Sequence, residues 1–225
     1  MKKTLAIVAF VAAMLVAGKA QAQLSVNIGF APETFTEIWD DDPYSTIMSG
    51  FFAGATYNIN LIKDLGLSVG GQIRWNTDSG SSSDNVDLGP FHIAGSDSHY
   101  KSNQILVDIP ILVNYGYSIN RTMRVSAFVG PTINFGIYGK TSGETTVDYL
   151  GSTTTTSFSD DWYSKEKNEY NSIKRFNLSA TAGVAFSFKQ FRVFGGYNYG
   201  LLNVANHTNI TAKTAAPFFG LSYTL

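Results

Sequence analysis

FNLSATAGVAFSF, residues 176–188, alternates apolar with polar or small side chains along its whole length. Phe176, Leu178, Val184 and Phe186 share one phase, and the residues between them are small or uncharged. A period of two indicates a β-strand with one apolar face. The stretch therefore predicts a strand that lies between an apolar and a polar environment.

The same alternation recurs in seven other stretches, and no helical pattern separates them. These stretches are residues 24–30, 50–60, 65–76, 103–117, 122–138, 191–200 and 213–225. The connections between stretches are short at 61–64, 118–121 and 189–190, long at 31–49, 77–102 and 139–173, and intermediate at 201–212. Short turns on one rim and long loops on the other are typical of outer-membrane barrels. We therefore predict an all-β fold: an eight-stranded antiparallel transmembrane β-barrel with long extracellular loops and short periplasmic turns.

The polar faces of these strands carry Asn, Ser, Thr and Gln, with almost no Lys or Glu. A soluble sandwich or lipocalin-like barrel would place charged residues on that face, because the face would meet bulk water. Only 15% of all residues are charged, against about 25% in a typical soluble domain. Uncharged polar residues suit a hydrogen-bonded lumen, and the apolar faces then suit lipid.

The N-terminus has the features of a secretion signal. Lys2 and Lys3 precede an apolar run from Leu5 to Ala17, and Ala20-Gln21-Ala22 has the small-x-small pattern of a cleavage site. The run is too short to span about 30 Å of hydrocarbon. We expect residues 1–22 to be a cleaved signal peptide and residues 23–225 to form the barrel. We expect the protein in the outer membrane of a Gram-negative bacterium, with both termini periplasmic because the strand number is even.

Acidic residues gather in the long connections, which hold 15 of the 17. Removal of the signal leaves 13 of the 16 basic residues, so the mature chain is acidic. Nucleic acid is not an expected partner, because phosphate binding needs clustered Lys and Arg. The carboxylates of residues 37–42 lack the spacing of a calcium loop, and no metal site or cofactor is predicted.

Four charged residues point into the lumen by strand parity: Arg74, Asp108, Arg124 and Arg192. We interpret them as an internal network of ion pairs that rigidifies the barrel, or alternatively as a narrow anion-favouring path. Three arginines face one carboxylate, so further carboxylates from the loops are expected to pair with them, because a buried unpaired charge is costly.

Aromatic side chains fall near the ends of the strands on the apolar face. We predict that they anchor the barrel in the two membrane interfaces. They are Trp75 and Tyr199 toward the long-loop rim, and Tyr115, Tyr117 and Tyr223 toward the short-turn rim.

Three segments give the chain a family resemblance. They are Ile109-Pro110-Ile111-Leu112, Gly130-Pro131 and Tyr197-Asn198-Tyr199-Gly200-Leu201-Leu202-Asn203. The chain resembles small Bacteroides-type outer-membrane β-barrel proteins, the porin-family group that includes PorT-like proteins. The closing Phe219–Leu225 resembles the terminal strand of that family, although it ends in Leu225 where an aromatic residue is usual. The resemblance implies a barrel, and it implies no activity.

No recognised catalytic pattern is present, and the three histidines lie in the long or intermediate connections. We expect a non-enzymatic structural or surface-interaction protein that displays acidic extracellular loops. The alternatives are a passive small-solute porin, or an accessory subunit of an outer-membrane secretion or uptake complex. The expected partners are outer-membrane lipid and lipopolysaccharide, with a further envelope protein under the surface-interaction and subunit hypotheses.

Overall fold

The computed structural model describes residues 22–39, 42–62, 64–88, 91–149, 152–164, 172–207 and 210–225. The predicted signal peptide lies, except for Ala22, outside the described residues. The strands in the described part are β1 Ala22–Phe30, β2 Glu33–Trp39, β3 Asp42–Ile62, β4 Leu65–Leu88, β5 Phe91–Ser118, β6 Met123–Tyr149, β7 Ser152–Asp161, β8 Phe176–Phe188, β9 Phe191–Gly200 and β10 Ile210–Thr224. None of the described residues forms a helix long and apolar enough to cross a membrane.

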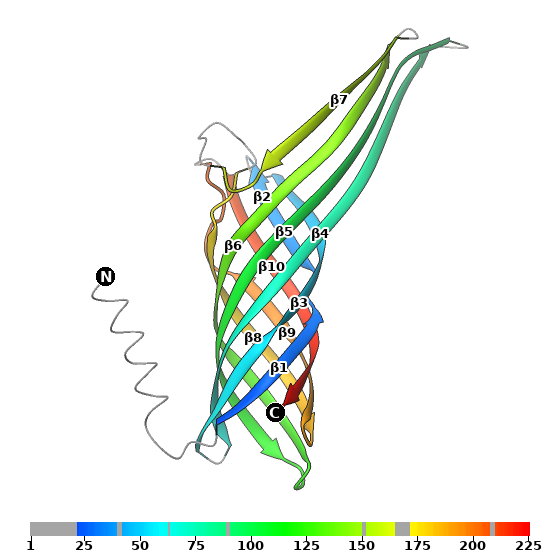
Figure 1. The fold of residues 1–225 in the computed structure, drawn as a ribbon. Coiled ribbons are helices and arrows are strands. Elements are labelled where there is room, and N and C mark those ends of the chain that lie inside the picture. The colour runs from blue at the N-terminus through cyan, green and yellow to red at the C-terminus, as the bar shows by residue number, and fades with distance from the viewer. Residues whose placement is uncertain are drawn as a thin grey trace.

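The strands close into a ring, which confirms the predicted eight-stranded antiparallel barrel (Figure 1). β1 and β2 are two parts of one ring position, because both lie between β10 and β3. Around the ring follow β3, β4, β5, β6, β8, β9 and β10. Ile28 shows the closure, since it pairs with Leu221 of β10 and with Ala53 of β3.

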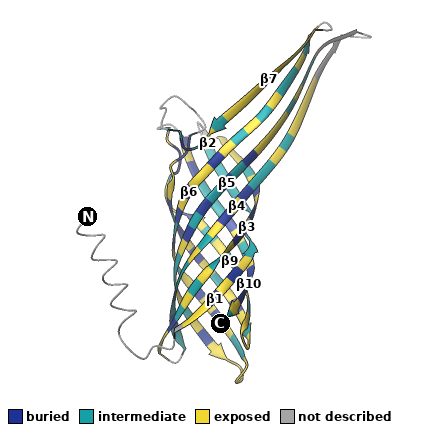
Figure 2. Cartoon of the chain, viewed as in Figure 1, coloured by how far each residue is buried: buried dark blue, intermediate teal, exposed yellow. Residues whose placement is uncertain are grey.

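The two faces of each strand differ as the alternation predicts (Figure 2). On β8, Val184 is 63% exposed on the outside, whereas Thr181 is 3% exposed on the inside. Exposed Ile, Val, Leu, Phe and Tyr side chains continue around the barrel wall. An exposed apolar band of this extent is stable in hydrocarbon rather than in water.

The lumen is less polar than the strand patterns predict. Phe52, Phe128, Phe194 and Phe218 point inward and contact one another, with ring centroids 6.1–6.3 Å apart. The prediction of a mostly polar inner face is therefore incomplete. An eight-stranded barrel is just wide enough to be filled by its own side chains, and phenylalanine fills that space.

The long connections predicted at 77–102 and 139–173 are mostly strand, and this prediction of loops is wrong. β4, β5 and β6 continue past the barrel as a projecting sheet, and β7 pairs with β6 at its side (Figure 1). Residues 152–159, which lie in the predicted connection 139–173, belong to β7. Thr and Ser side chains bond across these strands, as Thr146 does with Thr155 at 3.1 Å. Such pairs stabilise strands that have no apolar alternation.

The predicted loop 31–49 is also largely strand, since it contains β2 and the first part of β3. At the opposite rim the short turns are present, as predicted. Lys189, in the turn between β8 and β9, has a φ of 53°, which is the left-handed region that tight hairpins require.

Inward glycines make room for the lumen aromatics, and this gives a prediction about stability. A Cβ added at Gly183 would collide with the Phe128 ring and the Gly195 carbonyl oxygen. We expect Gly183→Ala to lower the free energy of unfolding by about 1–3 kcal/mol, because overpacking forces neighbours to shift. Urea titration of the refolded barrel in vesicles measures this. Gly71→Ala is the control, since a Cβ there meets nothing within 4 Å. Equal stability of the two variants would contradict the prediction.

Candidate functional site

The half of the lumen next to the projecting sheet, which we call the outer half, holds a buried ion-pair network. Arg74 of β4 donates from Nε to Asp108 Oδ2 of β5 at 2.9 Å and from Nη2 to Asp108 Oδ1 at 3.4 Å. Its Nη1 lies 3.3 Å from Glu33 Oε1 of β2. The three residues are only 3%, 0% and 6% exposed for Arg74, Asp108 and Glu33. The predicted partners Arg74 and Asp108 are therefore brought together, with a second carboxylate on the same guanidinium.

Glu33 was not predicted as a member of this network, because the stretch 31–49 was expected to be a loop. The expectation that a loop carboxylate would pair with a lumen arginine is correct for Arg74. A signal was present, since Glu33, Phe35 and Glu37 alternate with Thr34 and Thr36 in the manner of a strand. The pairing of β2 with β10 and β3 places Glu33 over the outer mouth of the ring.

Amide side chains extend the network to the outer rim. Asn76 donates to Glu33 Oε2 and, at 2.9 Å, to Gln104 Oε1. Gln104 donates to the Tyr163 hydroxyl at 3.1 Å. Tyr163 follows β7 and lies outside the strands of the barrel wall; burial raises its pKa to about 12, so the hydroxyl stays protonated. Tyr163 is buried over the mouth, where Gly136 leaves room for its ring.

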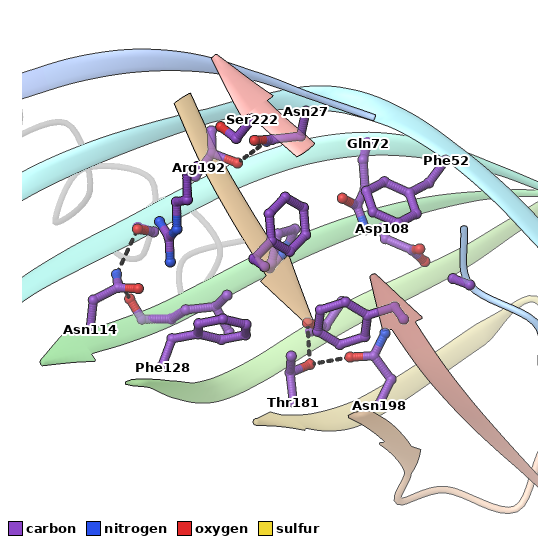
Figure 3. Close-up of a pocket in the computed structure, with 18 of the residues that line it drawn as sticks. Asn27, Phe52, Gln72, Asp108, Asn114, Phe128, Thr181, Arg192, Asn198 and Ser222 are labelled. Carbon is purple, nitrogen blue, oxygen red and sulfur yellow. Dashed lines mark hydrogen bonds between the residues drawn. The ribbon is translucent and has the colours of Figure 1, made fainter. Parts of the chain in front are cut away.

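The lumen below this network is mostly filled. A cavity of about 80 Å³ lies among Asp108, Gln72 and the four inward phenylalanines (Figure 3). It is large enough for ordered water. Hydrogen bonds between neighbouring strands line it, such as Thr181 to Asn198 at 2.7 Å. The network above and the aromatic side chains within leave little free volume along the barrel axis.

Arg124 and Arg192 do not join Arg74 and Asp108, so the prediction of one four-residue network is wrong. Arg124 donates to the backbone oxygen of Asp64 at 3.2 Å. The Arg192 guanidinium lies 5.7 Å from the centre of the Phe128 ring. Both residues lie near the short-turn end of strands β6 and β9. Strand parity gives the inward direction of a side chain but not its contacts: Arg192 lines the same cavity as Arg74 and Asp108 but forms no ion pair with Asp108.

The predicted interface aromatics all lie on the outer surface of the barrel and are exposed: Trp75, Tyr115, Tyr117, Tyr199 and Tyr223. The Tyr223 ring packs against Phe191 with centroids 5.2 Å apart, and its hydroxyl donates to Gln190 at 3.2 Å. This position, with an apolar body and a bonded polar tip, is the one that tyrosine prefers at a membrane interface.

An open pocket of about 410 Å³ lies at the outer rim, where the projecting sheet leaves the barrel. Its lining combines carboxylates with aromatic rings: Glu33, Glu37, Asp78 and Asp160, and Phe35, Tyr44, Tyr100, Phe158 and Trp162. Trp162 donates to Thr141 at 2.8 Å, which fixes its ring at the base of the sheet. Carboxylates beside aromatic faces suit a cationic group. Among the described residues, no group of three or more His, Asp or Glu side chains is placed to hold a metal ion.

The closed ring, apolar outside and filled inside, agrees with the comparison to protein families. Residues 18–206 match the family described as outer membrane protein beta-barrel domain. The chain belongs to this family. An outer membrane β-barrel of this kind lies in lipid, with lipopolysaccharide in the outer leaflet of a Gram-negative cell. No curated protein matches the chain.

Several solved structures match the chain at low identity. The attachment invasion locus protein Ail of Yersinia pestis, in complex with the heparin analogue sucrose octasulfate, is 16% identical, with a TM-score of 0.37 over 91% of this chain and 99% of that one. Neisserial surface protein A is 12% identical, with a TM-score of 0.40 over 91% and 99%. The outer membrane protease OmpT of Escherichia coli is 10% identical, with a TM-score of 0.37 over 90% and 97%.

Arg74 is the cation between two buried carboxylates, and its loss should destabilise the barrel strongly. We expect Arg74→Met to lower the free energy of unfolding by about 3–5 kcal/mol, because Glu33 and Asp108 are left buried without a counter-charge. Urea titration in vesicles measures the change. Lys101→Met, which removes an exposed cation from β5, should change stability by less than about 0.5 kcal/mol. A similar small effect of both substitutions would show that the network contributes little.

Proposed function

We propose that this outer-membrane barrel is a non-enzymatic surface-interaction protein, and that its projecting sheet binds another protein outside the cell. The observation that carries the proposal is the extension of β4, β5 and β6, with β7 beside them, well beyond the barrel (Figure 1). Membrane anchoring alone needs strands of about 9–11 residues, whereas β4, β5 and β6 have 24, 28 and 27. The additional length serves contacts outside the bilayer.

The edge strand β7 supports this role. β7 pairs with β6 on one side, and no described strand pairs with its other side. From Ser152 to Ser159 it carries Ser, Thr and one Phe, all exposed, with no Lys and no Pro. Natural proteins protect edge strands with charges, prolines or bulges, so an uncharged free edge favours pairing with a strand of another chain.

The outer pocket adds a second point of contact at the base of the sheet. A Lys or Arg side chain of the partner would meet the carboxylates of Asp78 and Asp160 and the rings of Tyr44 and Tyr100. Tyr44 is well exposed and Tyr100 partly so, and both are therefore accessible to a partner. An acidic, aromatic pocket beside an open strand edge fits a basic extended segment of a protein.

The orientation follows from this role. The projecting sheet faces outward, the short turns and both termini lie in the periplasm, and residues 1–22 are the cleaved signal that precedes the barrel at 23–225. We also propose that the chain is of the small Bacteroides-type, PorT-like group, which the segments at 109–112, 130–131 and 197–203 support. The interface aromatics Trp75 and Tyr115 mark the two lipid boundaries.

One row of side chains contains the three residue types of a Ser–His–carboxylate active site. Ser81, His99 and Glu144 lie opposite one another on β4, β5 and β6 of the projecting sheet. All three are exposed, and no hydrogen bond joins these described side chains to one another. A Ser–His–carboxylate site works through hydrogen bonds between its members and shelter from water. The row is better explained as part of the polar surface of the sheet.

Conductance separates the proposal from the porin alternative. The ion-pair network and the inward phenylalanines fill the lumen, so we expect no steady single-channel conductance from the refolded protein in a planar bilayer. The double variant Arg74→Ala, Arg192→Ala is measured beside it. Steady conductance of the unaltered protein, with an ion preference that changes in the double variant, would establish a pore and contradict the proposal.

Photo-crosslinking in living cells tests the strand edge. A photoreactive amino acid at Thr154, Thr155 or Thr156 should give a discrete protein adduct at alternate positions, because successive residues of a strand face opposite sides. The lipid-facing Val184 is the control position and should give none. Lysine at two flanking β7 positions, Thr153→Lys and Ser157→Lys, should abolish the adduct, because charge protects an edge.

The same experiment distinguishes the subunit alternative. Adducts at Val184 and Val193 on the barrel wall, with none on β7, would indicate a membrane complex that contacts the barrel wall. Adducts on β7 that survive the lysine substitutions would show contact without strand pairing and would contradict the proposed mode of binding.

A further inference from the structure

The short-turn end of the lumen opens into a second cavity, of about 280 Å³. We call it the vestibule. Four cationic side chains line it: Arg121, Arg124, Lys189 and Arg192. The other lining residues are neutral, with Ser, Asn, Gln and Thr prominent among them, and no Asp or Glu contributes. The vestibule is therefore a concave surface with one sign of charge, which concentrates anions.

Arg124 and Arg192 lie in one row across the inner face of the sheet. Arg124 of β6 pairs with Ser187 of β8, and Ser187 pairs with Arg192 of β9. Strands are about 4.8 Å apart, so the two arginine backbones are separated by roughly 10 Å, with a serine hydroxyl between them. Arginine side chains from both sides can reach one oxyanion in this gap, and Ser187 supplies a third donor.

Among the residues that the structure describes, none of opposite charge pairs with Arg192. Its Nε is buried and has no hydrogen bond. Its guanidinium lies over the face of Phe128, 5.7 Å from the ring centre. Both ion pairs among the described residues belong to Arg74, so no described carboxylate lies within 4.0 Å of Arg192 or Arg124. A largely desolvated guanidinium beside a second one is costly unless an anion shares the site.

Arg74 and the vestibule cations differ in their partners. In the outer lumen one arginine has two carboxylates, whereas no described carboxylate pairs with any of the four vestibule cations. The inward phenylalanines and the Arg74 network lie between the vestibule and the outer pocket. A ligand would therefore enter from the short-turn rim alone.

We propose that the vestibule is a binding site for a small oxyanion, held by Arg124 and Arg192 with Ser187 between them. Phosphate and carboxylate groups match the fork of donors that arginine presents. The source of the phosphate is either a free anion or the headgroup of an anionic lipid at the rim. The site is independent of the projecting sheet, so the inference does not rest on the proposed surface role.

Phosphorus-31 NMR and calorimetry test the site on the full mature barrel, refolded in dodecyl maltoside without other anions. Inorganic phosphate is the probe, and we expect saturable binding. Arg192→Gln and Arg124→Gln should each weaken it by about tenfold or more, since a hydrogen bond to a charged group contributes at least that factor. Lys101→Gln, on the exposed part of β5, is the matched control and should leave binding unchanged. Circular dichroism and gel migration confirm that each variant is folded.

A second arm places the barrel in nanodiscs of phosphatidylglycerol or of phosphatidylcholine. A headgroup signal that depends on Arg192 in phosphatidylglycerol, with no binding of inorganic phosphate, assigns the same site to a lipid headgroup. Binding of inorganic phosphate that is lost in Arg192→Gln assigns it to a free anion. The proposal is overturned if neither probe binds, or if binding persists unchanged in both arginine variants.

Discussion

The absence of water in the bilayer is the constraint on which the rest of the structure depends. Every backbone N–H and C=O group at membrane depth must find a partner within the protein, because an unpaired group in hydrocarbon costs several kcal/mol. A sheet meets this requirement only by closing on itself. The pairing of β1 with both β10 and β3 completes the ring and leaves no edge in lipid.

Closure with eight strands sets the contents of the lumen. The ring is narrow, so side chains fill it. Charges in this space need partners. Arg74 pairs with two carboxylates, those of Asp108 on the neighbouring strand β5 and of Glu33 on β2. Tyr163 then covers the mouth and accepts a hydrogen bond from Gln104. These side chains therefore fill the lumen, which in a larger barrel would be an open channel.

Outside the membrane the same constraint no longer holds, and the fold uses that freedom at one end. No described strand pairs with the second side of β7, and water tolerates such a free edge whereas lipid would not. Aromatic and acidic side chains gather where the projecting sheet joins the barrel. At the opposite end, the vestibule collects unpaired cations around Arg192. The two ends therefore differ in charge, in shape and in the ligands that they suit.

The sequence by itself determined the ring strands, because a period of two is a local property that any strand at a lipid boundary must show. Residues 176–188 and 191–200 were predicted with the bounds that the structure has. The tertiary structure alone decided that 152–159 is a strand and that Glu33 pairs with Arg74, since both depend on which distant segment lies alongside. It also paired Asp108 with Arg74 and not with Arg192, although all three line one cavity. Strand parity fixes the direction of a side chain, whereas its partners follow from the register and height that only the closed barrel provides.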